Sequence, residues 1–310
     1  MRRKTAIPPA PLPQRHGVDP VRLRLPGTGA WSTVREYLVH RLPAVDPARI
    51  DAMLCGREIL GTDGPLAPDA PFAPGAHLWF YRDLPAEVHV PFEIEVLYRD
   101  EHLVVADKPH FLATTPRGRH VTQTALSRLR HGLGLPALSP AHRLDRLTAG
   151  LAMFVVRPDE RAAYQNLFRD RLVRKEYRAL ARYEPGLELP RTVRSRIVKE
   201  RGVIAAQEVA GPPNSESLIE LTGRTGGVGH YRLRPRTGRT HQLRLHMNSL
   251  GIPILGDPIY PVLLDEPAPD DFGSPLQLLS AVLEFTDPVT GGERRFESRR
   301  RLAPEPGPAR

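Results

Sequence analysis

The sequence is poor in the features that mark secreted and membrane-spanning proteins. Cys55 is the only cysteine among 310 residues, so a disulfide within the chain and a zinc site built on several cysteines are excluded. No apolar run approaches the ~18 residues that a membrane helix needs. The first four residues, Met1-Arg2-Arg3-Lys4, lead into prolines rather than into the apolar core of a signal peptide. We therefore expect a cytoplasmic protein that does not bind membranes.

Cofactor motifs are also missing. Four glycines between residues 223 and 229 lack the strand and helix that flank a phosphate loop, and they are better interpreted as the tip of a hairpin. His241 and His246 are five residues apart, so they do not share a helical face, and no third metal ligand is near. We expect no metal, nucleotide or redox cofactor.

Negative charge is scarce in two long segments of the chain. Residues 121–182 hold 12 arginines and lysines against 5 acidic residues, and residues 190–246 hold 11 against 4. The first 120 residues have no such surplus, although the whole chain carries a net charge of +9. Genome bias can raise the arginine content of a whole chain, so we give more weight to this distribution. It predicts that a polyanion binds to the surface formed by these two segments.

Chain length and proline content predict the domain organisation. The chain exceeds the ~100–200 residues of a typical domain, which favours one large and one smaller domain. Residues 1–30 are rich in proline and show no apolar period, and prolines exclude a helix or a central strand there. We expect an extended arm, solvated or touching a polyanion through basic residues 2–4. At the other end, residues 303–310 are expected to form a disordered tail.

Residues 31–84 have the pattern of a small α+β domain. Ser32 or Thr33 suits the N-cap of a first helix, and Asp46-Pro47 opens a second one. Short strands are expected near residues 58–60 and 77–81, between turns rich in glycine and proline.

Residues 88–302 alternate between strand and helix patterns and form the larger domain. Strand patterns at residues 93–98 and 102–106 predict a hairpin, and the chain ends in a second hairpin over residues 276–298. Helices are expected over residues 122–130, after Pro158-Asp159, and from Thr240 to Gly251.

One stretch of this larger domain has the character of a catalytic loop. Asp145 lies between the cations Arg143 and Arg146, and the chain then enters the apolar segment 151–156. Catalytic groups are often held on a loop by a rigid strand. A surface ion pair between Asp145 and its neighbours is the alternative.

Three motifs resemble those of the RluA-type RNA pseudouridine synthases, in the order of that family. His142-Arg143-Leu144-Asp145, followed by Leu147-Thr148-Ala149-Gly150-Leu151, is similar to the catalytic signature, with Ala149 where the family usually has Ser or Thr. Lys175-Glu176-Tyr177-Arg178-Ala179 resembles the next motif. The segment 231–246 resembles the third. The resemblance covers roughly residues 88–300.

The resemblance implies a fold and a function. The fold would be α+β, with a mixed, largely antiparallel sheet, flanking helices and a central RNA cleft. Residues 31–84 weakly resemble the S4 RNA-binding domain, but they are less basic, so we leave open whether they bind RNA or are only structural. The function would be isomerisation of specific uridines in structured RNA, ribosomal or transfer, to pseudouridine by a monomeric enzyme.

The resemblance also assigns residue roles. Asp145 would be the catalytic residue, as a nucleophile on C1′ or a base at C2′ of the ribose. Arg244 would pair with Asp145 and keep it ionised, and Tyr177 would stack on the uracil and take the C5 proton. Substrate-binding roles are expected for a set of residues around them: Arg143, which would fill the gap left by the displaced base, His142, and the phosphate-binding arginines Arg174, Arg236 and Arg239.

Two other functions remain as alternatives. A catalytically inactive RNA-binding or assembly protein could keep this fold, but loss of Asp145, Tyr177 or Arg244 would then be expected, and all three are present. An unrelated aspartate hydrolase acting on nucleotides would need a second carboxylate or a metal motif, and the sequence supports neither.

Overall fold

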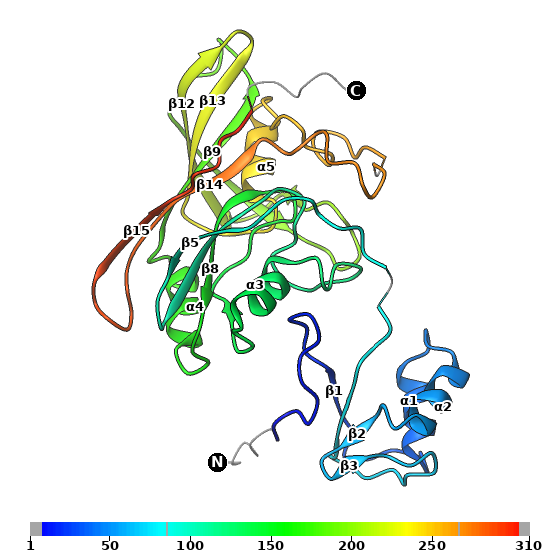
Figure 1. Cartoon of the computed structure of the whole chain (residues 1–310). Helices are drawn as coiled ribbons and strands as arrows, with labels where there is room; N and C mark the ends of the chain where they lie inside the picture. The colour runs from blue at the N-terminus through cyan, green and yellow to red at the C-terminus, as the bar shows by residue number, and fades with distance from the viewer. Residues whose placement is uncertain (1–7, 85, 266, 304–310) are drawn as a thin grey trace. The chain divides into compact units, whose positions relative to one another are not determined.

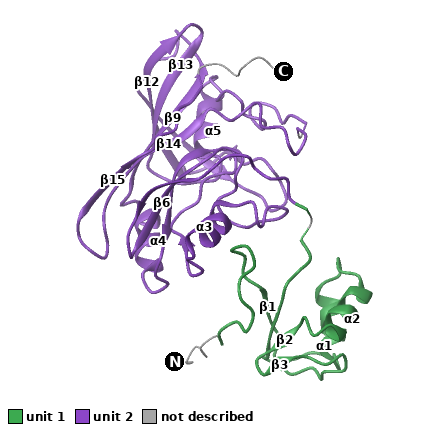
Figure 2. Cartoon of the chain, viewed as in Figure 1, with its two compact units in different colours: residues 1–86 green, residues 87–310 purple. Residues whose placement is uncertain are grey.

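The computed structural model describes residues 8–84, 86–265 and 267–303, and the chain divides into two compact units, residues 1–86 and 87–310 (Figure 2). Basic residues 2–4 and most of the expected C-terminal tail lie outside the described residues. Each unit has a hydrophobic core of its own.

Unit 1 combines two short helices with a four-stranded sheet in the order β1-β4-β2-β3 (Figure 1). The side chain of Thr33 accepts a hydrogen bond from Glu36 N and that of Asp46 accepts one from Ala48 N, so both helices start at the predicted caps. The elements are β1 (Val21–Arg24), α1 (Val34–Arg41), α2 (Pro47–Cys55), β2 (Leu60–Gly61), β3 (Gly64–Pro65) and β4 (His77–Phe80).

The N-terminal arm is shorter than the sequence suggested. Val21–Arg24 form an edge strand that pairs antiparallel with β4, and Leu25 is buried in the core of unit 1. The expectation of an aperiodic arm to residue 30 is therefore wrong. Val21, Leu23 and Leu25 alternate with two arginines, which suits a strand with one buried face, and the last proline before them is Pro20.

Unit 2 is built on an eleven-stranded sheet. Nine strands follow the order β11-β10-β12-β13-β9-β14-β8-β6-β5, while β15 pairs with β14 and β7 with β8. Every pair is antiparallel except β8 with β14, which confirms the expected α+β fold with a mixed, largely antiparallel sheet. The elements are β5 (Glu95–Arg99), β6 (Leu103–Lys108), α3 (Ala125–Leu133), β7 (Ser139–Pro140), β8 (Ala149–Val155), α4 (Arg161–Arg169), β9 (Arg174–Arg182), β10 (Arg191–Val198), β11 (Gln207–Val209), β12 (Ser215–Thr225), β13 (Val228–Pro235), α5 (Gln242–Ser249), β14 (Leu278–Thr286) and β15 (Glu293–Glu297).

The parallel contact between β8 and β14 requires a glycine. Gly150 has φ +105, and a Cβ added there would lie 2.2 Å from the carbonyl oxygen of Ser280. Because only glycine combines this backbone conformation with so close an approach, Gly150 lets the strand that follows the Asp145 loop pack directly against β14.

Helices cover both faces of the sheet (Figure 1). Alternate residues of β6 point to opposite sides, so Val104 packs with α3 in one core cluster while Leu103 packs with α4 in another. Helix α5 packs on β12 and β13 in a third cluster. Leu147 and Tyr177 contact both the α3 cluster and the α5 cluster, so the Asp145 loop lies where these two parts of the core meet.

Candidate active site

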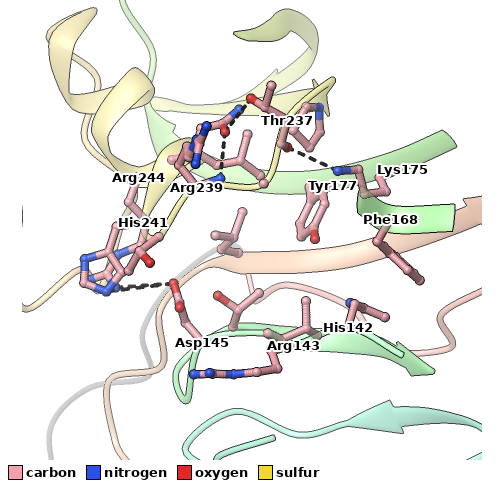
Figure 3. Close-up of a pocket in the computed structure, with 18 of the residues that line it drawn as sticks. His142, Arg143, Asp145, Phe168, Lys175, Tyr177, Thr237, Arg239, His241 and Arg244 are labelled. Carbon is pink, nitrogen blue, oxygen red and sulfur yellow. Dashed lines mark hydrogen bonds and ion pairs between the residues drawn. The ribbon is translucent and has the colours of Figure 1, made fainter. Parts of the chain in front are cut away.

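The three motifs meet in one cleft of about 790 Å³ in unit 2 (Figure 3). The walls come from the Asp145 loop, the end of α4, strand β9 and the segment from Pro235 to Arg244. Six of the predicted site residues line the cleft: His142, Arg143, Asp145, Tyr177, Arg239 and Arg244. Lining residues that sequence reasoning did not assign include Thr148, Phe168, Lys175 and His241.

The Asp145 loop is fixed by side chains from the segment after β6. The hydroxyl of Thr114 donates to the carbonyl of Leu144 at 2.8 Å and accepts from its N–H at 3.1 Å. Nδ1 of His110 donates to the carbonyl of Leu147 at 2.7 Å. Backbone groups on both sides of Asp145 are therefore held in place, as a catalytic side chain on a loop requires.

Lys108 supports the same loop from below and does not reach the cleft. Its ammonium donates to the carbonyls of Pro109 at 2.9 Å, Leu112 at 2.7 Å and Arg146 at 3.3 Å. The residue is fully buried, and burial lowers the pKa of Lys108 to about 7, although the charge of Asp145 opposes this. Contact between Lys108 and a phosphate is not compatible with this burial.

The carboxylate of Asp145 faces two cationic or ionisable groups across the cleft. Its Oδ2 lies 3.9 Å from Nη1 of Arg244 and 3.9 Å from Nε2 of His241. The Asp145 side chain is 36% exposed, so it is accessible to a ligand in the cleft. Neither contact is short enough for a hydrogen bond.

Arg244 lies 3.9 Å from Asp145, its predicted partner, and binds a different carboxylate more closely. Its Nε donates to Oδ2 of Asp257 at 2.7 Å, and its Nη2 donates to Oδ1 at 2.6 Å. Burial alone would lower the pKa of Arg244, but the hydrogen bonds and charge of Asp257, with a smaller contribution from Asp145, raise it. A guanidinium with almost no exposed surface needs a bidentate partner, and Asp145 is its second, more distant one.

Asp257 and Tyr260 form the layer behind Arg244. Oδ1 of Asp257 also accepts from the N–H groups of Ile259 and Tyr260, and the Arg244 guanidinium lies 5.3 Å from the centre of the Tyr260 ring. Sequence analysis assigned no role to Asp257 or Tyr260. No local pattern connects a carboxylate with an arginine thirteen residues earlier, so the sequence offered no signal for this pair.

Tyr177 and Lys175 lie on β9 at the same wall (Figure 3). Burial raises the pKa of Tyr177 to about 12, and the charge of Asp145 adds to the shift, so the phenol is neutral near pH 7. The ammonium of Lys175 donates to the carbonyl of Thr237 at 3.1 Å. Burial lowers the pKa of Lys175 to about 8, so this side chain is still a cation at neutral pH.

The predicted phosphate-binding arginines do not share one environment. Arg239 lines the cleft, where its Nε donates to the carbonyl of Asn214 at 3.2 Å. Arg143, which was expected to fill the gap left by the displaced base, also lines the cleft as an exposed side chain. Arg174 and Arg236 lie outside the lining. Two carboxylates on neighbouring strands attract them: Glu284 lies 3.4 Å from Arg174, and Glu216 lies 3.7 Å from Arg236.

His142 has a packing role as well as a place in the cleft wall. Its Nε2 accepts from Met153 N at 3.2 Å, and its ring stacks on Phe168 with 4.3 Å between ring centres. Burial lowers the pKa of His142 to about 3, so the ring is neutral. The expected substrate contact is thus restricted to the ring surface that lines the cleft.

His241 is the residue of the third motif that sequence reasoning judged only as a metal ligand. His241 adopts a left-handed conformation, φ 58 and ψ 16, immediately before α5. It is the N-cap of this helix, one residue later than the predicted cap at Thr240. Nδ1 of His241 lies 3.0 Å from the Tyr260 hydroxyl, and burial lowers the pKa of His241 despite the opposing charge of Asp145.

Residues 8–84, 86–265 and 267–303 contain no group of three or more His, Cys, Asp or Glu side chains that could hold a metal ion. They also contain no helix with the length and apolar content to cross a membrane.

Comparison with known proteins connects this geometry to one family. The family described as RNA pseudouridylate synthase matches residues 102–249. The dual-specificity RNA pseudouridine synthase RluA of Haemophilus influenzae is 30% identical over 230 residues, which are 69% of this chain and 97% of that protein. The ribosomal large subunit pseudouridine synthase D of Pseudomonas aeruginosa is 30% identical over 230 residues, 66% of this chain and 68% of that protein.

A solved structure shows a similar but weaker match. Human RNA pseudouridylate synthase domain containing 4 aligns with a TM-score of 0.49 at 24% identity, covering 67% of this chain and 88% of that chain.

Proposed function

Because this chain belongs to the RluA-type RNA pseudouridine synthase family, we propose that Asp145 is the catalytic residue with which it isomerises uridine to pseudouridine. The observation that carries the proposal is the position of the Asp145 carboxylate. This carboxylate is partly exposed in the cleft and faces the buried cation of Arg244. The neutral phenol of Tyr177 lines the same cleft.

The reaction needs a carboxylate at the sugar. Pseudouridine formation breaks the N-glycosidic bond of a uridine, turns the uracil and joins its C5 to C1′. The proton lost from C5 is balanced by one gained at N1, with no net oxidation or reduction. Asp145 would act either as a nucleophile on C1′ or as a base at C2′. The guanidinium of Arg244, held by Asp257, places a fixed positive charge 3.9 Å from the Asp145 carboxylate.

The cleft suits a nucleotide that has left its helix. Extruding a base costs a few kcal/mol of stacking and pairing energy, and the exposed Arg143, next to Asp145, would fill the gap. Lys175 and Arg239 would face the phosphates on either side. Tyr177 would stack on the uracil as a neutral ring.

Ribosomal or transfer RNA is the proposed substrate. One relative is named a dual-specificity RNA pseudouridine synthase and another a ribosomal large subunit synthase. We also propose that the protein is cytoplasmic and monomeric. The single cysteine, which fits a reducing compartment, supports the location.

An inactive RNA-binding protein with this fold remains the alternative. The fixed loop around Asp145 argues against this alternative. A protein that only binds RNA has no need for the buried ion pair of Arg244 and Asp257 behind an exposed carboxylate.

The experiment maps pseudouridines in ribosomal and transfer RNA from cells with and without the gene, and then from deleted cells carrying Asp145→Asn. We expect at least one site to disappear on deletion and to stay absent with Asp145→Asn. Asp159→Asn is the matched control, because this carboxylate is 73% exposed and lies outside the cleft. Full modification by Asp145→Asn would contradict the proposal.

A further inference from the structure

We propose that His241 binds the 2′-hydroxyl of the target nucleotide, so that the enzyme prefers ribose to deoxyribose at the position it modifies. The inference rests on the proposed function, because it takes Asp145 as the group that acts on C1′ or C2′. It adds a ribose-binding residue and a physical basis for selecting RNA over DNA at the reacting nucleotide.

Hydrogen bonds at the Tyr260 hydroxyl determine which nitrogen of His241 carries the proton. The Tyr260 oxygen lies 2.8 Å from the carbonyl oxygen of Ala206, 2.9 Å from Ala206 N and 3.0 Å from Nδ1 of His241. A carbonyl only accepts, so the single phenol proton goes to Ala206 O, and the hydroxyl accepts from both nitrogens. Nδ1 of His241 is therefore protonated.

The other ring nitrogen is then free to accept a hydrogen bond. With the ring neutral, Nε2 carries a lone pair, and burial favours the neutral ring. Nε2 faces Oδ2 of Asp145 at 3.9 Å (Figure 3). Two acceptors at this distance do not bind each other, and neither the Asp145 carboxylate nor Nε2 has a hydrogen-bond donor among the described residues. A ligand that supplies a donor between them would satisfy both.

The chemistry of RNA identifies that donor. A nucleotide inside an RNA chain has one free ribose hydroxyl, at C2′, because both other oxygens are esterified to phosphate. That hydroxyl lies on the ring face opposite the base. A carboxylate that displaces uracil in line approaches C1′ on this same face, and a base at C2′ acts on the carbon that bears the hydroxyl. In either mechanism the 2′-hydroxyl comes next to Asp145, within reach of His241.

The backbone of His241 is held in one conformation. Left-handed φ and ψ angles are unfavourable for a residue with a side chain and persist where the surroundings enforce them, often at functional sites. The hydrogen bond between Nδ1 and the Tyr260 hydroxyl also fixes the orientation of the ring, and the His241 side chain is only 11% exposed. The acceptor is thus preorganised, so little ordering is needed when the ribose binds.

The test compares an RNA stem-loop of about 20 nucleotides carrying the mapped uridine with the same stem-loop carrying 2′-deoxyuridine there. Single-turnover rates give a ribose-to-deoxyribose ratio for each protein. His241→Asn removes the acceptor at the Nε2 position while tolerating the left-handed backbone, and His241→Gln restores an acceptor oxygen near it. Deoxyuridine has its own intrinsic reactivity, which affects all proteins equally and cancels when their ratios are compared.

We expect the wild-type ratio to be about tenfold higher than the ratio of His241→Asn, in line with one hydrogen bond. His241→Gln should recover part of this difference. Arg143→Ala is the control: it should slow both substrates and keep the wild-type ratio. A ratio in His241→Asn within about twofold of the wild-type ratio overturns the inference. The proposed function fails separately, if the wild-type protein does not modify the ribose substrate at all.

A second measurement tests the tautomer without activity. Nitrogen-15 spectra of the histidine-labelled full chain, assigned with His241→Asn, should show a neutral His241 ring protonated at Nδ1. Tyr260→Phe, which removes the accepting hydroxyl, should shift the proton toward Nε2. A wild-type ring protonated at Nε2 contradicts the inference.

Discussion

Buried charge decides the roles of single residues in this cleft. Arg244 and Asp257 expose about 2% and 1% of their side chains and bind each other bidentately. Asp145 in contrast keeps a third of its surface accessible. The Arg244–Asp257 pair therefore places a fixed cation near Asp145 and leaves the Asp145 carboxylate accessible to a ligand.

Asp257→Asn should harm both stability and catalysis, although Asp257 does not line the cleft. Breaking a buried ion pair leaves an uncompensated charge and costs about 3–5 kcal/mol, so the free energy of unfolding in urea should fall by about 3 kcal/mol. The single-turnover rate should fall as well, because Arg244 loses the partner that orients it toward Asp145.

The control for Asp257 is Glu297→Gln. Glu297 pairs with Arg178 at 2.8 Å, but both side chains are more than two-fifths exposed, so the loss should stay below about 1 kcal/mol. Equal losses in the two variants would show that burial does not set the strength of the Arg244 pair.

The high pKa of Tyr177 makes a prediction about proton transfer. If tyrosinate took the C5 proton in the free enzyme, the active fraction would rise about tenfold per pH unit up to pH 12. We instead expect the single-turnover rate to lack this rise between pH 7 and 9, because the phenol acts as a neutral stacking ring. A slope of one that Tyr177→Phe abolishes would restore the role expected from the sequence.

At the scale of elements, the contact between β8 and β14 positions the Asp145 loop. Gly150 should not tolerate a side chain, since its backbone is left-handed in φ and an added Cβ would meet the Ser280 carbonyl. We expect Gly150→Ala to lower the free energy of unfolding by roughly 3 kcal/mol or more, measured by urea denaturation.

A second glycine gives the opposite expectation. Gly132 lies in α3, and no atom stands within 4 Å of an added Cβ. Gly132→Ala should therefore raise stability by about 0.5–1 kcal/mol, because alanine favours the helix. A loss in Gly132→Ala as large as that in Gly150→Ala would mean that the β8–β14 contact is not the cause.

At the scale of the whole molecule, two arginines of unit 1 already have carboxylate partners. Arg35 pairs with Asp51, and Arg49 binds both Glu58 and Asp83. Arginines with such partners release few counterions on binding RNA. We therefore expect Arg35 and Arg49 to add little to the electrostatic attraction of RNA.

Salt dependence of RNA affinity tests this expectation in the full chain. Each phosphate contact adds about 0.7–0.9 to the slope of log affinity against log salt. Arg239→Ala should flatten the slope by nearly that amount, whereas Arg49→Ala should leave it unchanged. A flatter slope in Arg49→Ala would make unit 1 part of the RNA-binding surface.

Local patterns sufficed for much of the fold. Capping residues explain the helix starts at Thr33 and Asp46. Alternation of apolar residues explains the hairpin of β5 and β6, and turn propensity explains the glycine-rich tip between β12 and β13. All three signals act over a few residues. The three motifs also identified Asp145, Tyr177 and Arg244 as candidate catalytic residues, because each motif is contiguous in the sequence.

Tertiary structure alone decided the partners of charged groups. Which carboxylate an arginine binds depends on which of the two is removed from water, and this follows from contacts between distant segments. Arg244 thus binds Asp257 more closely than Asp145, and Arg174 and Arg236 pair with Glu284 and Glu216 outside the cleft.

The same reason explains His241. Its sequence position allowed only a test for metal-ligand spacing, whereas its protonated nitrogen is set by Tyr260 and Ala206, which come from two other parts of the chain. The sequence by itself determined which residue types enter the cleft. The fold determined their hydrogen-bond partners and burial, and through these their protonation states, because both depend on residues far away along the chain.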